Sequence, residues 1–255
     1  MNTISPPPQI RRISPSKRIL GVVVGIAGGL GANALLAYSF TTFYTRGTKF
    51  VPYDTNSPDH TTAVFRAHNP LSNPPVCIDH AVKSIPYASL PSKYRVQDGK
   101  GSVDRAALAT DFCRGIWSGV AYRVQRRYLE RKYRALEGRE DSLWDLRDLE
   151  KSEYKVGTKI TDHFQVVEHD DSKVIVRCGD SPLNQDHRPS DGLFAMEVST
   201  DDDKQMATFH LKSNFINTTP QGKDAQPLPW HVQFAHRWYT KLWMESATRK
   251  VLKDA

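Results

Sequence analysis

Paired cysteines and familiar catalytic motifs are missing from this chain of 255 residues. Its three cysteines, Cys77, Cys113 and Cys178, are an odd number without CxxC spacing, so neither a disulfide framework nor a cysteine-based zinc site is expected. The sequence also has no glycine-rich phosphate loop, no HExxH, no GxSxG and no kinase signature. These absences argue against the common NTPase, zinc-protease, serine-hydrolase and kinase classes, and nothing in the sequence calls for a cofactor or a metal.

Acidic residues are absent before Asp54, whereas six lysines and arginines precede it. These bases account for six of the seven net positive charges, so the rest of the chain is close to neutral and a nucleic-acid partner is not expected. Residues 1–18 contain the run Pro6-Pro7-Pro8, which forbids a regular helix. We predict a disordered basic flank there, similar in composition to a mitochondrial presequence.

Charged residues and histidine are also absent from residues 19–45, which lie between Arg18 and Arg46. At a rise of ~1.5 Å per residue, ~20 residues cross the ~30 Å apolar core of a bilayer. A buried soluble helix and a cleaved signal peptide are the alternatives. However, charge-free runs of this length are rare in globular cores, and further apolar residues follow the glycines of this run. We therefore predict a single transmembrane helix, with membrane lipid as its partner.

Glycines at four-residue spacing, Gly21, Gly25 and Gly29, share one face of this predicted helix. Such a face lets two transmembrane helices approach closely, so self-association through the anchor is one interpretation, and a glycine-rich anchor without a partner is the other. The excess of bases before the helix favours an N-terminus in the cytosol or the mitochondrial matrix. The expected localisation is a single-pass membrane protein of the mitochondrial inner membrane or the endoplasmic reticulum.

Residues 46–75 are rich in proline, asparagine, threonine and serine, which predicts a linker that lies against the following domain. Tyr53, Val64 and Phe65 are the side chains expected to insert into the surface of that domain. The remaining residues, 76–255, have the length of one ordinary domain.

This domain is predicted to begin with a strand at residues 76–86 and a long helix from Ser102 to about Leu136. Apolar residues at helical spacing predict an inward stripe, formed by Cys113, Ile116, Trp117, Val120, Val124 and Tyr128. The other faces of the helix carry six arginines and one lysine. An acidic-lipid or phosphate surface is one interpretation of these bases. Ion pairing with the acidic segment 140–203 is the interpretation we favour.

Apolar and polar residues alternate from residue 160 onward, which predicts two hairpins, at residues 160–178 and 193–217. A final helix is predicted to start at Trp230. The order of strand, helix, hairpins and C-terminal helix indicates an α+β domain with an antiparallel sheet.

Three stretches of the domain are similar to the DUF2867 family, a domain of unknown function. They are Tyr154-Lys-Val-Gly157 with Ile160-Thr-Asp-His-Phe164-Gln-Val-Val, the alternation from Phe209 to Phe215, and Phe234-Ala-His236-Arg-Trp-Tyr. The resemblance covers about residues 76–252. It implies a helix-grip fold of the START and Bet v 1 type, in which an antiparallel sheet wraps a long C-terminal helix around an apolar cavity. The membrane anchor and the arginine-rich helix depart from the family, which supplies no catalytic residue.

The polar residues of the last predicted strand are the most interesting set for chemistry. His210, Lys212 and Asn214 share one face and alternate with apolar residues on the other face. In a cavity they would polarise a carbonyl or move a proton. We expect instead that the apolar face meets the C-terminal helix and the polar face meets water, since burial of unpaired polar groups is costly. If both faces are covered, Lys212 would need an acidic partner such as Glu197 from the neighbouring strand, and the trio would lie in a wet pocket. Trp117 and Trp238 lie on apolar stripes and are predicted to be buried.

Two functions remain open from the sequence. The first is membrane-anchored binding of a lipid or another apolar small molecule, which needs an apolar cavity with one or two polar groups. The second is a cyclase or isomerase acting on an apolar metabolite in the same cavity, which needs several convergent titratable residues. In both cases the residues expected to contact the ligand are Trp117, His210, Lys212, Asn214, His236 and Trp238.

Overall fold

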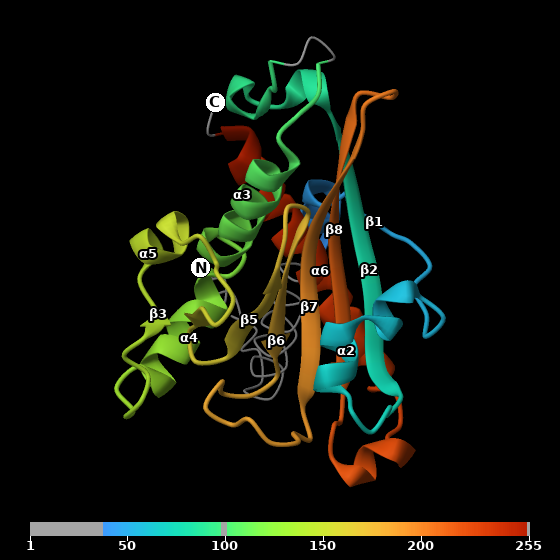
Figure 1. Ribbon diagram of the computed structural model, residues 1–255, viewed down its shortest axis with the longest axis vertical. Coiled ribbons are helices and arrows are strands. Elements are labelled where there is room, and N and C mark those ends of the chain that lie inside the picture. The colour runs from blue at the N-terminus through green and yellow to red at the C-terminus, as the bar shows by residue number, and fades with distance from the viewer. Residues whose placement is uncertain (1–37, 98–100, 254–255) are drawn as a thin grey trace, which may run out of the picture. The chain divides into compact units, whose positions relative to one another are not determined.

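A computed structural model of the chain describes residues 38–97 and 101–253 (Figure 1). The chain divides into two compact units, Met1–Tyr44 and Thr45–Ala255. Within the first unit the described residues, 38–44, are helical.

The predicted basic flank 1–18 lies outside the described residues, and so does most of the predicted transmembrane helix 19–45, including Gly21, Gly25 and Gly29. Among the helices that are described, none combines the length and the apolar character required to span a bilayer.

The strands described in the second unit form one eight-stranded sheet, in the order β1-β2-β8-β7-β6-β5-β4-β3. Neighbouring strands are antiparallel except for β3 and β4, which are parallel. The strands are β1 Lys49–Phe50, β2 Pro75–Pro86, β3 Ser142–Leu143, β4 Lys159–Ile160, β5 Phe164–His169, β6 Lys173–Cys178, β7 Asp191–Asp201 and β8 Met206–Ile216. The predicted opening strand and both hairpins are confirmed.

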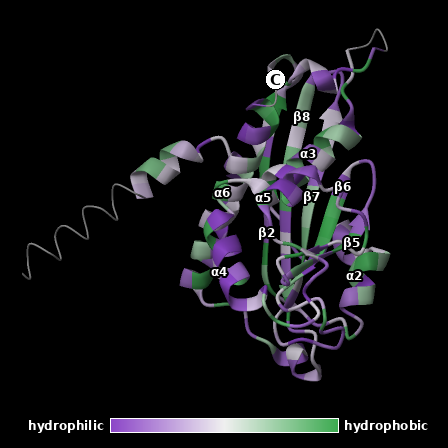
Figure 2. Cartoon of the chain, turned by 90° about the vertical axis from the view of Figure 1, so that its left-hand side faces the viewer, coloured by the Kyte–Doolittle hydropathy of each residue, from purple (hydrophilic) through white to green (hydrophobic). Residues whose placement is uncertain are grey.

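Helices cover both faces of the sheet. The α-helices are α2 Ala63–His68, α3 Arg105–Ser118, α4 Arg123–Tyr133, α5 Leu146–Lys151 and α6 Trp230–Lys253, and the short 3-10 helices are η1 Pro58–Thr61, η2 Tyr87–Ser89, η3 Ser92–Tyr94 and η4 Pro220–Asp224. Figures 1 and 2 show α6 and α2 on opposite sides of β2 and β8. Helix α3 packs against α6 and against β6 and β7. The predicted α+β domain with an antiparallel sheet and a long C-terminal helix is confirmed.

The apolar face of β8 meets the helices as predicted. Phe209 and Leu211 are fully buried, and the Phe209 ring contacts the Phe112 ring of α3 at a centroid distance of 5.0 Å. Trp117 of α3 is also buried, with an exposed fraction of 1%. Trp238 is only half-buried, so the prediction of its burial is wrong. The buried indole of α6 is Trp243, because the fully buried face belongs to the C-terminal half of this helix.

The long helix predicted from Ser102 to Leu136 is wrong, because the chain breaks it into α3 and α4. Asp104, and not Ser102, caps the start of α3 by accepting a hydrogen bond from Ala107 N at 2.9 Å. Helix α3 ends at Ser118, and the next residue, Gly119, has an extended backbone. It lies against Ser246 Oγ and the Gly115 carbonyl so closely that a Cβ atom does not fit.

This break turns half of the predicted inward stripe outward. Cys113, Ile116 and Trp117 are buried as expected. Val120, Val124 and Tyr128 are instead 71%, 78% and 59% exposed. In their place α4 contributes the buried side chain of Leu129. The error arose because helical spacing was continued across a glycine whose close contacts depend on α6.

The predicted pairing of the basic helix faces is confirmed in part. Arg134 contacts Asp145 of the acidic segment at 2.8 Å, whereas Arg114 contacts Asp111 of its own helix at 2.8 Å. Other bases on the exposed side of α4 make no ion pair within the described residues; these are Arg123, Arg127 and Arg131.

Residues 46–75 lie against the domain as predicted but are more regular than a linker. They contain β1, η1 and α2, and Thr62 caps α2 by accepting a hydrogen bond from Phe65 N at 3.3 Å. Tyr53, Val64 and Phe65 line a small pocket of about 40 Å³ on the face of the sheet opposite α6. This segment is therefore part of the domain and covers one face of the sheet.

Candidate ligand-binding cavity and buried polar cluster

A pocket of about 390 Å³ lies between α6 and the strands β5 to β8. Its lining is largely aromatic and includes Phe164, Phe194, Phe215, His236, Tyr239 and Trp243. Small-molecule sites have volumes of about 300–1,000 Å³ and mostly apolar walls with a few polar groups. The pocket therefore has the size and lining of a site for an apolar small molecule.

Trp243 is the centre of the aromatic wall. Its ring contacts those of Tyr239 at 5.0 Å, Phe194 at 5.2 Å and Trp117 at 5.4 Å between centroids. The indole is buried, and Trp243 Nε1 has no hydrogen-bond acceptor among the described residues. Buried indole N–H groups usually find a partner. This donor is consequently available to a carbonyl or hydroxyl oxygen of a bound molecule.

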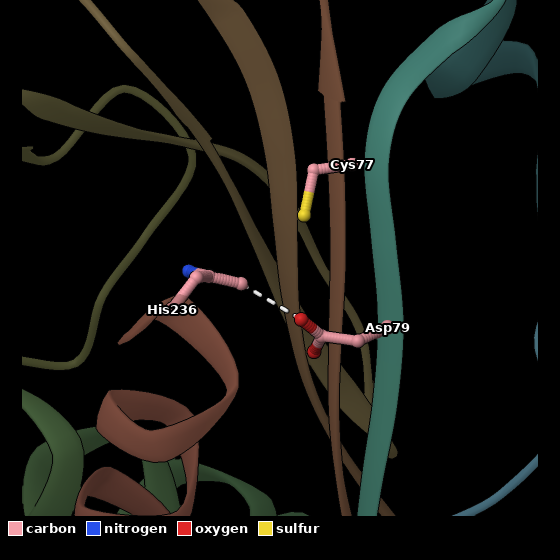
Figure 3. Close-up of side chains that lie close together, drawn as sticks. All are labelled: Cys77, Asp79 and His236. Carbon is pink, nitrogen blue, oxygen red and sulfur yellow. Dashed lines mark ion pairs between the residues drawn. The ribbon is translucent and has the colours of Figure 1, made fainter. Parts of the chain in front are cut away.

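The pocket shares His236 with a buried cluster that also contains Cys77 and Asp79. Cys77 and Asp79 occupy inward-facing positions of β2, and His236 extends toward them from α6 (Figure 3). His236 Nε2 lies 2.9 Å from Asp79 Oδ2. The thiol, carboxylate and imidazole donor atoms of the three residues all lie within 4.8 Å of one another. We call these three residues the Cys77–Asp79–His236 cluster.

The carboxylate of Asp79 is buried without the donors that such a group requires. Asp79 is 4% exposed, and neither of its oxygens accepts a hydrogen bond of normal geometry from the described residues, although His236 Nε2 is close. Ser213 lies opposite Asp79 in the β2–β8 register, is fully buried, and its Oγ also has no partner there. Adjacent buried polar groups without partners are rare in folded proteins.

Burial sets the protonation of the nearby groups. It raises the pKa of the Cys77 thiol to about 11, and the charge of Asp79 adds to this effect. The isolated thiol is therefore protonated at neutral pH. Burial also lowers the pKa of His163, another residue of the pocket, so that its imidazole is neutral.

The predicted polar trio lies on the opposite face of β8, and the expectation that this face meets water is wrong. Lys212 Nζ lies 2.7 Å from Glu197 Oε2 and 3.0 Å from Asp59 Oδ2. Asn214 is 4% exposed and hydrogen-bonds His60. The face is covered because the segment before β2 folds back over it, which the pattern within β8 itself does not show.

His210 completes this outer network. Its Nδ1 lies 2.9 Å from His80 Nε2, and its Nε2 lies 2.8 Å from Ser199 Oγ. Burial, followed by the charges of His210 and Lys212, lowers the pKa of His80 to about 4. Burial alone would lower the pKa of Lys212, but the hydrogen bond and charge of Glu197, with those of Asp59, raise it. The network thus holds a charged lysine beside an imidazole of His80 that is neutral at pH 7.

The six residues predicted to contact a ligand do not form one site. His236 lines the pocket, and Trp117 packs behind Trp243. Trp238 does not line it, and neither do the residues of the trio, which are separated from the pocket by the sheet. Of the residues that line the pocket, sequence reasoning named only His236, and it missed Tyr239 and Trp243 there as well as Cys77 and Asp79 of the cluster. The alternation of Cys77, Asp79 and Ala81 on β2 was the available signal, since it places a carboxylate on a buried face.

Comparison with known proteins supplies no relative for this chain. The search against protein-family models gives no match, and neither do the searches of curated proteins and of solved structures. The resemblance to the DUF2867 family accordingly stays a prediction from the residues that suggested it.

Proposed function

We propose that this protein is a membrane-anchored binding protein for a lipid or another apolar small molecule, held in the pocket between α6 and the sheet. The observation that carries the proposal is the 390 Å³ pocket with its aromatic lining. Burial of apolar ligand surface contributes about 25 cal/mol per Å². The Trp243 indole and the His236 imidazole are the polar groups that would orient one oxygen of the ligand.

The anchor part of the proposal rests on residues 19–45, which carry no charge over a length that exceeds a bilayer span. A tethered pocket suits a molecule that is dissolved in the bilayer, because the ligand then reaches the protein without crossing much water. Membrane lipid is therefore both the environment and the expected source of the ligand.

Quenching of tryptophan fluorescence tests the proposal. The full-length protein in lipid nanodiscs is titrated with a brominated fatty acid, whose bromine quenches indoles that it touches. We expect saturable quenching that is largely lost in Trp243→Phe and is weakened in Thr240→Phe, which places a ring in the pocket. Thr208→Phe, on the opposite face of β8, is the matched control and should behave as the wild type. Equal quenching in all variants would mean that the fatty acid contacts the protein only from the bilayer.

A cyclase or isomerase is the second candidate function, and the contact between His236 and Asp79 favours it. A carboxylate beside an imidazole orients the ring and supports proton transfer to or from a ligand. If His236 moves a proton, molecules extracted after incubation in heavy water should carry deuterium at carbon, and His236→Gln should abolish the label. Absence of label in the wild type would leave binding as the function.

A further inference from the structure

We propose that Cys77, Asp79 and His236 bind a zinc ion. The cluster joins a thiol and a carboxylate from one strand with an imidazole from α6, and the three donor atoms face a common point (Figure 3). Thiolate, imidazole and carboxylate are the three side-chain ligands that zinc takes in proteins. Hard cations such as Mg²⁺ and Ca²⁺ prefer oxygen ligands, so the mixed set selects a borderline-soft metal.

The geometry is close to what zinc requires. Bonds of about 2.0 Å to nitrogen and 2.3 Å to sulfur in a tetrahedral site place the donor atoms roughly 3.5 Å apart. His236 Nε2 and Asp79 Oδ2 are already 2.9 Å apart, and the largest separation within the cluster is no more than 4.8 Å. Small side-chain shifts therefore bring the three donor atoms to the separations of a tetrahedral zinc site.

An ion pair between His236 and Asp79 alone does not satisfy the buried polar atoms of the cluster. A protonated His236 would balance the charge of Asp79, but both carboxylate oxygens would still lack a hydrogen bond of normal geometry. Ser213 Oγ, on the neighbouring strand β8, also has no hydrogen-bond partner among the described residues. A cation between the carboxylate, the imidazole and the thiolate satisfies the charge and the open lone pairs together. His236 is 21% exposed at its side chain and lines the pocket, which provides a path of entry for the ion.

Spacing within the sequence did not reveal this site. Cys77 and Asp79 are two residues apart on one strand, whereas His236 is far away on the last helix. Zinc motifs that are recognised from sequence contain at least two ligands at a characteristic separation, such as CxxC or HExxH. The inference does not depend on the apolar ligand, because the metal has its own ligands and its own readout.

Cobalt substitution provides the test. The full-length protein, purified in detergent with an affinity tag that lacks histidine, is stripped with a chelator and titrated with Co²⁺. We expect saturation near one equivalent, with a thiolate-to-cobalt charge-transfer band and the intense visible bands of tetrahedral cobalt. Addition of Zn²⁺ should remove both. A wild-type protein that shows neither band contradicts the proposal, and this result requires no variant.

Matched variants locate the site. Cys77→Ala should remove the charge-transfer band, and Asp79→Asn and His236→Gln should weaken Co²⁺ binding by at least about tenfold, since even outer-shell partners of a metal contribute ~10–100-fold. Cys113→Ala, at another buried cysteine, and His231→Gln, at an exposed histidine of α6, should bind as the wild type does. Retention of the band in Cys77→Ala, or its loss in Cys113→Ala with an unchanged melting temperature, would place the metal elsewhere and overturn the proposal.

Discussion

The two faces of the β2–β8 strand pair both bury polar side chains, but they satisfy them to different degrees. On the outer face Lys212 contacts two carboxylates, and His210 contacts Ser199 and His80. On the inner face Lys83 pairs with Glu245 of α6, but Asp79 contacts only His236 among the described residues. Some outer atoms also lack partners, namely His60 Nδ1 and Asn214 Oδ1, but no outer carboxylate does among the described residues.

We propose that this difference separates a structural network from a binding site. A buried network whose charges are paired fixes how the covering segment packs, and it leaves no group free for a ligand. A buried carboxylate without donors beside an aromatic pocket is costly unless something binds there. The contrast leads us to assign function to the inner face and stability to the outer face, and the following predictions test it.

The largest effect is expected for the aromatic core behind the pocket. Trp117→Ala should lower the free energy of unfolding by roughly 3–5 kcal/mol, because the side chain is 1% exposed and contacts several rings. Trp238→Ala should cost about 1 kcal/mol, since this ring is only half-buried. Chemical denaturation of both variants measures the difference, and equal losses would show that α6 packs in another way.

A smaller effect is expected for the outer network. Lys212→Met leaves Glu197 and Asp59 without their cation and should cost about 1–3 kcal/mol, with no change in the molecule bound in the pocket. Lys204→Met, which removes an exposed ion pair with Asp201, should leave stability unchanged within error and is the control. Thermal unfolding measures stability. Loss of the bound molecule in a folded Lys212→Met protein would assign function to the outer face as well.

The outer network should also make stability depend on pH. The pKa of His80 is about 4 in the folded chain, compared with 6.5 for a histidine exposed to water as in the unfolded chain. The pKa of His210 is also lowered in the folded chain. Between pH 6.5 and pH 4 His80 binds a proton in the unfolded chain but not in the folded chain. The free energy of unfolding is therefore highest above pH 6.5 and decreases as the pH falls toward 4. The charged or titratable groups near His80 are His210, Lys212, Glu197 and Asp59, together with Tyr53, whose ring lies 5.7 Å from that of His80 between centroids.

Melting temperatures between pH 7 and pH 4 measure this dependence. His80→Gln should flatten the decline relative to the wild type, whereas His231→Gln, at an exposed histidine, should leave it unchanged. An identical slope in the wild type and in His80→Gln would mean that His80 titrates normally and that the outer face is open to water.

The smallest effect is expected on α4. Val124→Ser should change the free energy of unfolding by no more than about 0.5 kcal/mol, because its side chain is 78% exposed. Ile116→Ala on α3 should cost roughly 2–5 kcal/mol, since that side chain is fully buried. A continuous helix with one inward stripe would make both substitutions costly, so denaturation of this pair distinguishes the two arrangements.

The parts of the fold that follow from local pattern could be predicted from the sequence. Alternation identified β2, the two hairpins and the inward face of β8, because the period of a strand is visible within a few residues. The break at Gly119 was missed, because the apolar spacing continues past this glycine, and its close contact with Ser246 of α6 is visible only in the fold. The covering of Lys212 by Asp59 was equally hidden, because the two residues belong to segments far apart in the chain.

Few residues of the candidate site were predicted from the sequence. The structure has a pocket between the sheet and α6, but its lining differs from the residues that the sequence suggested. His236 was named as a ligand-contacting residue, whereas its partner Asp79 was not. Side chains that meet through the folding of a strand against a distant helix leave no spacing in the sequence to recognise.

The molecule that remains with the purified protein is the most direct test of the assignment to the inner face. Full-length wild type, Thr240→Phe and Thr208→Phe are purified in detergent, extracted with organic solvent and compared by mass spectrometry. We predict an apolar compound in a fixed ratio to the wild type and to Thr208→Phe, and depleted in Thr240→Phe, whose new ring occupies the pocket. A compound retained equally by all three proteins, or none in the wild type, would contradict the assignment of the pocket as the binding site.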